Sequence, residues 1–179
     1  MQLNRSTRIF LFAAMLLVVG FVINHLYRLP KFKSGDSALP FKAQLIDGSS
    51  FDLKSLQGQY VLLDFWGSWC GPCRKESPHL VSLYKDFHNK TFKNATGFEI
   101  VSIAIERKET HWRKAIQDDG LNWKYHIGQM NRFSDELPVL YGVREIPTKY
   151  LLDTNGTIIM VNPAFDAIRD FLNAKVVTD

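Results

Sequence analysis

The longest uninterrupted apolar stretch of the chain lies near its N-terminus. From Ile9 to Ile23 no side chain is charged or strongly polar, and residues 24–27 extend the stretch to roughly the length of a bilayer-spanning helix. The pattern predicts a short tail over residues 1–8 and a transmembrane anchor over residues 9–27.

A cleaved signal peptide is the competing interpretation of this segment. The apolar stretch is short, and Arg5 and Arg8 resemble the basic region that begins such peptides. No small-x-small cleavage site follows, so a retained anchor is favoured. Positive residues flank the segment on both sides, and charge therefore does not decide on which side of the membrane the rest of the chain lies.

A polar segment separates the anchor from a globular part. Residues 28–38 contain Lys, Ser, Gly and Asp with little apolar content and are predicted to form a linker, which leaves residues 39–179 for the domain. A β-hairpin is expected over residues 41–53, because Asp47 and Gly48 suit a tight turn between its two short runs.

The rest of the domain alternates between strand and helix patterns. Residues 60–66 form a nearly continuous apolar run, typical of a strand buried on both faces, with Asp64 as its one ionisable residue. Further elements follow from apolar periodicity and turn residues: a helix over residues 70–87, a strand over 98–105, a helix over 109–119, strands over 148–153 and 157–161, and a helix over 164–174. This order predicts a layered α/β fold.

The charge of the chain does not indicate a nucleic-acid partner. The net charge is +4, but residues 1–38 hold five basic residues and one acidic residue, and the remaining residues hold 17 of each sign. The predicted domain is therefore neutral, whereas nucleic-acid binding needs a concentrated basic face.

Both cysteines of the chain fall in one tetrapeptide, Cys70–Gly71–Pro72–Cys73, where the first domain helix is predicted to begin. Free backbone N–H groups and the positive end of the helix dipole stabilise a thiolate, which is the reactive form of cysteine. We therefore expect disulfide exchange, with Cys70 as the nucleophile and Cys73, one turn later, as the resolving thiol.

Other roles for the cysteines fit the sequence less well. Structural zinc needs four ligands, but the chain has no second Cys pair and no closely spaced His pair, and His79 is the one candidate nearby. Two inert buried thiols would not require this combination of strand, Gly-Pro spacer and helix. No metal is expected, and no cofactor apart from the redox-active disulfide. The domain histidines are expected to be solvated or to cap helices: His79, His88, His111 and His126.

The residues around the cysteines resemble the active site of thioredoxins. The similarity includes Asp64, six positions before Cys70, and Pro78, five positions after Cys73. It implies the thioredoxin fold, with a central mixed β-sheet flanked by helices, to which the predicted hairpin would be an N-terminal extension.

Residues 146–148 are similar to the cis-proline loop that faces the disulfide in the thioredoxin superfamily. The resemblance implies that Pro147 belongs to the catalytic site. A cis proline would leave the polar groups of Ile146 free to pair with an extended substrate. The substrate-binding residues are then expected to be Trp69, Gly71, Pro72, Ile146 and Thr148.

Two acidic residues are candidates for proton chemistry. Asp64 is expected to lie beneath the cysteines, where burial would raise its pKa and let it accept or relay the proton of Cys73. A carboxylate at the exposed end of the strand is the alternative. Relatives that serve cytochrome c maturation carry an active-site Glu after the strand that ends here at Ile105, which makes Glu106 a weaker candidate.

Within the superfamily, the chain resembles the membrane-anchored TlpA-like or ResA-like thiol-disulfide oxidoreductases. The resemblance covers about residues 39–162 and includes Arg74 and Glu76 after the cysteines. It implies a single-pass protein of the bacterial cytoplasmic membrane whose domain lies on the periplasmic or extracytoplasmic side. Protein disulfides would be its substrates, and a membrane thiol-disulfide protein would be its electron donor.

The expected function is reduction of disulfides in exported proteins, because the Gly-Pro spacer resembles that of reducing members. Apocytochrome c is a client suggested by the resemblance. A thiol peroxidase on the same fold is an alternative, but that class places a Thr three residues before its peroxidatic Cys, where this chain has Gly67. A membrane-tethered binding module without catalytic activity is the other alternative.

Overall fold

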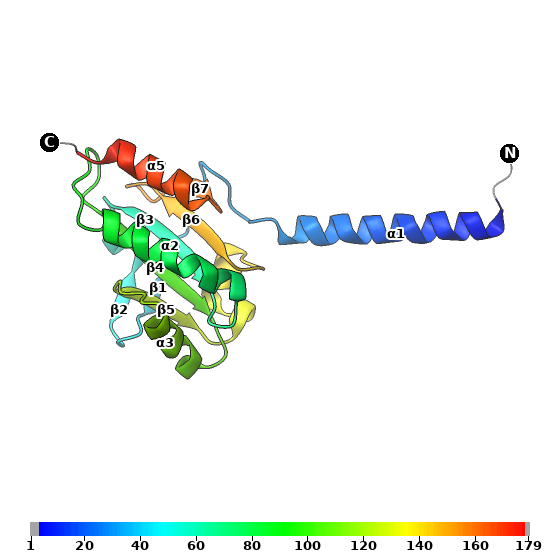
Figure 1. The fold of residues 1–179 in the computed structure, drawn as a ribbon, viewed down its shortest axis with the longest axis horizontal. Helices are drawn as coiled ribbons and strands as arrows, with labels where there is room; N and C mark the ends of the chain where they lie inside the picture. The colour runs from blue at the N-terminus through cyan, green and yellow to red at the C-terminus, as the bar shows by residue number, and fades with distance from the viewer. Residues whose placement is uncertain (1–3, 178–179) are drawn as a thin grey trace.

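The computed structural model describes residues 4–177 and consists of a long N-terminal helix and an α/β domain (Figure 1). Residues 1–3 of the predicted tail and residues 178–179 of the predicted domain lie outside the described residues. Helix α1 (Arg5–Arg28) projects away from the domain, and none of its residues is buried. It is long and apolar enough to cross a membrane.

A mixed sheet of five strands forms the centre of the domain, in the order β5-β4-β3-β6-β7. β3, β4 and β5 are parallel, whereas β6 runs antiparallel to both β3 and β7. The bounds are β3 (Tyr60–Trp66), β4 (Phe98–Ile105), β5 (Tyr125–Gln129), β6 (Thr148–Leu152) and β7 (Ile158–Val161). Every residue of β3 is buried, which explains its nearly continuous apolar sequence.

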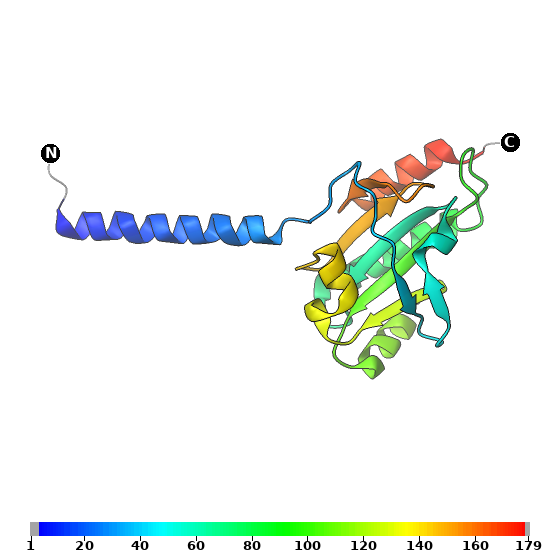
Figure 2. The ribbon, with the colours of Figure 1, turned by 180° about the vertical axis from the view of Figure 1, so that it is seen from behind.

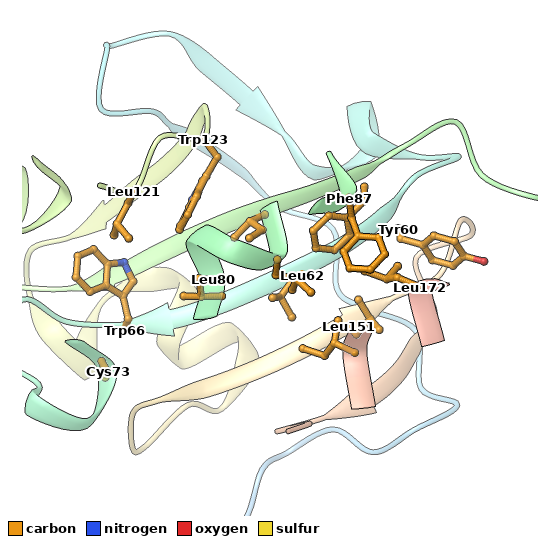
Figure 3. Close-up of a cluster of buried hydrophobic side chains, with 14 of the residues drawn as sticks. Tyr60, Leu62, Trp66, Cys73, Leu80, Phe87, Leu121, Trp123, Leu151 and Leu172 are labelled. Carbon is orange, nitrogen blue, oxygen red and sulfur yellow. The ribbon is translucent and has the colours of Figure 1, made fainter. Parts of the chain in front are cut away.

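Three helices cover one face of the sheet: α2 (Gly71–Phe87), α3 (Glu109–Asp118) and α5 (Phe165–Lys175) (Figure 1). Alternate residues of β3 point toward them, including Leu62 and Trp66. The apolar cluster beneath these helices extends from Cys73 and Trp66 at one end to Tyr60 at the other (Figure 3). The cysteines therefore sit at one end of a packed core.

The predicted hairpin covers the opposite face (Figure 2). Strands β1 (Lys42–Gln44) and β2 (Ser50–Asp52) pair antiparallel, and the 3₁₀ turn η1 (Leu53–Leu56) follows them. Gly48 has a φ of 86°, the left-handed conformation that its place in the turn requires. The hairpin and the mixed thioredoxin-like sheet are both confirmed.

Part of the segment that was expected to be a free linker is docked on the domain. Helix α1 continues to Arg28, and the backbone N–H of Gly35 donates to the carbonyl of Ile158 in β7. The backbone N–H of Ile158 donates in turn to Asp36, and Ser37 forms a β-bridge with Thr157. The edge strand β7 offers unpaired backbone groups, and these hold the segment in place.

Two elements were not predicted: β5 and the short helix α4 (Glu136–Tyr141), which follows the 3₁₀ turn η2 (Arg132–Ser134). In β5 a histidine and a glycine interrupt the apolar pattern. A Cβ on Gly128 would lie 2.8 Å from the ring of Trp112, so the glycine makes room for an aromatic ring of α3. α4 has six residues, too few for helical periodicity to be visible.

Candidate active site

The two cysteines form a disulfide at the N-terminus of α2. Their sulfur atoms are 2.12 Å apart, and Cys70 is the residue that caps the helix. The backbone N–H of Cys73 points at the sulfur of Cys70, at 3.2 Å. Pro72 occupies the first turn, where a missing N–H leaves no helical hydrogen bond unmade. In the reduced protein this geometry stabilises a thiolate on Cys70.

The loop that was expected to face the disulfide does so. The peptide bond between Ile146 and Pro147 is cis, and the carbonyl oxygen of Ile146 lies 3.8 Å from the sulfur of Cys70. Thr148 begins β6 and donates its hydroxyl to the carbonyl of Glu145 at 2.7 Å. The structure thus brings residues 146–148 next to a motif more than 70 positions earlier in the chain.

Asp64 is buried beneath α2, with 2% of its surface exposed. Burial is the main reason why its pKa rises to about 7; the charge of Lys149 opposes the rise and that of Glu76 adds to it. Its carboxylate accepts a hydrogen bond from the hydroxyl of Ser102 at 3.3 Å. The alternative of a carboxylate at an exposed strand end is wrong, since Asp64 lies within the core layer that also contains Cys73.

Trp69 is a large apolar side chain next to the disulfide that remains exposed, at 45%. Its indole N–H donates to the carbonyl of Ile105 at 2.6 Å, and the guanidinium of Arg132 lies 4.4 Å from the centre of a Trp69 ring. The indole therefore has a fixed position beside Cys70 while one surface remains available for contact. Nothing in the sequence around Arg132 indicated this contact.

Glu106 also belongs to the region around the cysteines. It is buried, and its two carboxylate oxygens accept hydrogen bonds from the backbone N–H of Ser68 at 2.5 Å and from the Ser68 hydroxyl at 3.0 Å. The weaker of the two acidic candidates thus contacts the turn that precedes Cys70.

Sequence reasoning missed an ion pair between a buried lysine and the partly exposed Glu76 next to Asp64. The ammonium of Lys149 lies 2.5 Å from a carboxylate oxygen of Glu76, and the Lys149 side chain is 5% exposed. Lys149 stands directly opposite Asp64 on the neighbouring strand. A lysine inside the apolar run Thr148–Leu152 was the available signal, because such a residue can be buried only with a partner.

The histidine prediction is wrong for His126. This residue is buried against the ring of Trp123, and its Nε2 lies 3.1 Å from the carbonyl oxygen of Leu121. Burial lowers its pKa to about 4, so the imidazole is neutral at physiological pH. Within residues 4–177, no three His, Cys, Asp or Glu side chains gather in a group that could hold a metal ion.

Comparisons with known proteins agree with this site. The AhpC/TSA family matches residues 34–161. The chain is 30% identical over 129 residues to the thiol-disulfide oxidoreductase ResA of Bacillus thuringiensis, which covers 72% of this chain and 69% of the relative. It is 26% identical over 180 residues to ResA of Bacillus subtilis, which covers 96% and 95%.

The solved structures that resemble this chain are also thiol-disulfide oxidoreductases or interchange proteins. The thioredoxin domain of a thiol-disulfide oxidoreductase from Bacteroides vulgatus has a TM-score of 0.69 and 28% identity, over 80% of this chain and all of that one. A putative thiol:disulfide interchange protein DsbE from Chlorobium tepidum has a TM-score of 0.66 and 28% identity, over 80% and 98%. The chain therefore belongs to the AhpC/TSA family of thioredoxin-fold proteins and, within it, to the ResA-like thiol-disulfide oxidoreductases.

Proposed function

We propose that this protein reduces disulfides in exported proteins through its Cys70–Cys73 couple. The observation that carries the proposal is the disulfide at the N-terminus of α2, with the loop of Ile146 beside it. In the reduced form, the thiolate of Cys70 attacks one sulfur of the substrate disulfide, and the other substrate sulfur leaves as a thiolate. A mixed disulfide between Cys70 and the substrate results.

Cys73 then resolves the mixed disulfide. Its thiol gives a proton to the carboxylate of Asp64, and the new thiolate attacks the sulfur of Cys70. The bond between Cys70 and the substrate breaks, and the second substrate sulfur leaves as a thiolate. The substrate gains two electrons, and Cys70 and Cys73 are left oxidised. Asp64 suits this role because burial places its pKa near neutrality.

We assign substrate contact to the surface around the disulfide. The carbonyl of Ile146 lies beside Cys70 and can accept a hydrogen bond from an extended peptide. Gly71 leaves open space, since a Cβ built on it has no neighbour within 4 Å. The exposed indole supplies apolar contact area. The proposed substrate-binding residues are Trp69, Gly71, Pro72, Ile146 and Thr148, with Pro147 at the centre of the loop.

We further propose that residues 9–27 anchor the protein in the bacterial cytoplasmic membrane, with the domain on the periplasmic or extracytoplasmic side. The length and apolar composition of α1 support an anchor. A membrane thiol-disulfide protein is the proposed electron donor, and proteins that require reduced thiols, including apocytochrome c, are the proposed clients.

Contacts between the anchor and the active-site loop support a donor in the membrane. Arg144 donates to the carbonyl of Tyr27 at 2.6 Å and its guanidinium stacks on the Tyr27 ring at 3.7 Å, while Arg28 lies 3.6 Å from the carboxylate of Glu145. Residues 144 and 145 directly precede Ile146. Figures 1 and 2 agree that α1 ends on this side of the domain. The disulfide is thus held toward the end of the anchor.

A thiol peroxidase is disfavoured by the packing at Gly67. A Cβ at this position would lie 2.9 Å from Nε1 of Trp69 and 3.1 Å from Cδ1 of Ile146. The Thr that peroxidases place three residues before their reactive cysteine therefore has no room here.

Insulin reduction by the full-length protein in detergent tests the proposed function. Turnover with a thiol reductant is expected in the wild type, with its complete loss in Cys70→Ser and trapped mixed disulfides in Cys73→Ser. A wild-type protein that consumes peroxide but not insulin is a peroxidase, and one that does neither is a binding module. Equilibration with glutathione buffers determines the direction; a strongly oxidising couple would refute reduction.

A further inference from the structure

A row of polar side chains crosses the sheet beneath α2. Ser102 of β4, Asp64 of β3 and Lys149 of β6 are direct partners on adjacent strands, so their side chains point to the same face. The neighbouring positions on this face are apolar core residues, among them Leu62 and Leu151 (Figure 3). Charged groups in such a layer need partners of opposite charge, and here one ammonium group stands between two carboxyl groups.

The ammonium of Lys149 interacts with two carboxyl groups. It bonds Glu76 on α2 at 2.5 Å and also lies close enough to Asp64 to lower its pKa. Asp64 accepts one hydrogen bond in the described part of the chain, from Ser102. A single cation shared between two carboxylates compensates each of them only in part, so ionisation of Asp64 is disfavoured while Lys149 is bonded to Glu76.

These polar side chains lie next to Cys73, the thiol that is proposed to resolve the mixed disulfide. Cys73 and Glu76 are three positions apart on α2, on neighbouring turns of the same helix face. The charged groups that face Asp64 from the packed elements are Lys149 and Glu76, and the Cys73 thiol joins them after reduction.

We propose that Lys149 is a positioning residue that controls when Asp64 holds a proton, by dividing its charge between Asp64 and Glu76. The inference rests on the proposed function for its role in catalysis. As the Cys73 thiol gives its proton to Asp64, that carboxylate becomes neutral and the charge of Lys149 is left to Glu76. When Asp64 releases the proton, Lys149 stabilises both carboxylates. The proton transfer thus leaves neither carboxylate without a partner, and the negative charge it moves to the sulfur of Cys73 passes to the departing substrate sulfur when Cys73 attacks Cys70.

Opposite changes in two variants are the signature of this arrangement. Lys149→Gln removes the cation and should raise the midpoint of Asp64 protonation by about one pH unit or more. Glu76→Gln removes a competing anion and leaves Lys149 to Asp64, so the midpoint should fall. The double variant should return toward the wild type, and Lys149→Arg should remain close to it. A structural role alone would not give shifts of opposite sign.

The protonation of Asp64 can be measured without any catalytic step. Infrared spectra of the oxidised full-length protein in detergent, recorded across pH, contain the carbonyl band of a protonated buried carboxyl group, and Asp64→Asn identifies it by its loss. The same variants are then compared in single-turnover resolution, with Cys70 preloaded with 5-thio-2-nitrobenzoate and release of the coloured thiol followed across pH.

The proposal is supported if Lys149→Gln and Glu76→Gln move the pH midpoint in opposite directions, both in the infrared titration and in single-turnover resolution. Shifts of the same sign, or no shift in either variant, would overturn it. If the infrared midpoints shift oppositely but the wild type never releases the coloured thiol, the proposed catalytic function fails, while the control of the Asp64 proton by Lys149 stands. Lys149→Gln could unfold, which Trp fluorescence would show. In that case Lys149→Arg and Glu76→Gln still test the proposal, because an unchanged midpoint of Asp64 protonation in Glu76→Gln is sufficient to refute it.

Discussion

The backbone N–H of Ser68 donates to a carboxylate oxygen of Glu106 at 2.5 Å, which fastens the turn before Cys70 to the end of β4. The Ser68 hydroxyl bonds the second oxygen of the same carboxylate. On the other side, the guanidinium of Arg74 reaches the carbonyl of Ser68 at 3.4 Å. The turn that delivers the nucleophile is therefore held from the sheet and from α2.

Replacement of Glu106 should loosen this turn, and more so when both of its hydrogen-bond acceptor oxygens are lost than when one is. Glu106→Ala leaves the partly buried N–H of Ser68 without its acceptor and should lower the free energy of unfolding by about 1–3 kcal/mol. Glu106→Gln keeps one acceptor oxygen and should have the smaller effect. Urea titration measures stability, and the alkylation rate of reduced Cys70 reports the position of the turn. Ser68→Ala is the matched control, because it keeps the backbone bond; a loss equal to that of Glu106→Ala would contradict this role.

Substitution of Gly67 should disturb the site by sterics alone. A Cβ there would collide with the indole of Trp69 and the side chain of Ile146, so Gly67→Ala should lower stability by about 1–3 kcal/mol and slow disulfide exchange. Gly71→Ala is the comparison, since a Cβ at that position meets nothing within 4 Å and alanine favours a helix. Equal stability of the two variants in urea titrations would show that the contact at Gly67 is unimportant.

The buried carboxyl of Asp64 predicts a loss of stability as pH rises. The folded state holds its proton up to about pH 7, whereas an unfolded Asp releases it near pH 4. Between these values the folded state binds more protons, so the free energy of unfolding falls with increasing pH, by up to about 4 kcal/mol from this group. Below pH 4 the contribution is fully present, and above pH 7 it is lost.

Asp64→Asn removes this pH dependence and should be more stable than the wild type above pH 7. The measurement is urea unfolding between pH 4 and pH 8, followed by Trp fluorescence. All four tryptophans lie between Trp66 and Trp123, so the signal reports the domain and not α1. Parallel pH profiles for the two proteins would mean that Asp64 is ionised in the folded state throughout this range.

Local sequence was sufficient for features that are contiguous along the chain. The buried strand with one carboxyl group and the helix that begins at the cysteines were predicted from patterns within a few residues. The loop at Pro147 was identified from its resemblance alone, because nothing local brings it to Cys70. Its position depends on the antiparallel pairing of β6 with β3, which is set by the whole sheet.

The partners of the site could not be predicted because they come from distant elements. Lys149 and Glu76 are 73 positions apart; a lysine in an apolar run signals that a partner exists, but nothing local shows that the partner is Glu76. The strand β5 was missed for a related reason. Its glycine is needed to accommodate Trp112 of another element, and tertiary packing overrides the local pattern there.

The contacts between α1 and the active-site loop predict that the disulfide stays close to the membrane surface. In lipid nanodiscs with dansyl-labelled headgroups, energy transfer from Trp69 should be substantial, because this exposed indole lies next to Ile146, in the loop that contacts α1. The contribution of Trp69 is obtained by subtraction of the transfer seen in Trp69→Phe.

The double variant Arg144→Ala/Glu145→Ala removes the contacts to Tyr27 and Arg28, so transfer from Trp69 should fall. Reduction of a small soluble disulfide should be little affected, since neither side chain touches the sulfurs. Unchanged energy transfer in the double variant would mean that these two contacts do not hold the disulfide toward the bilayer.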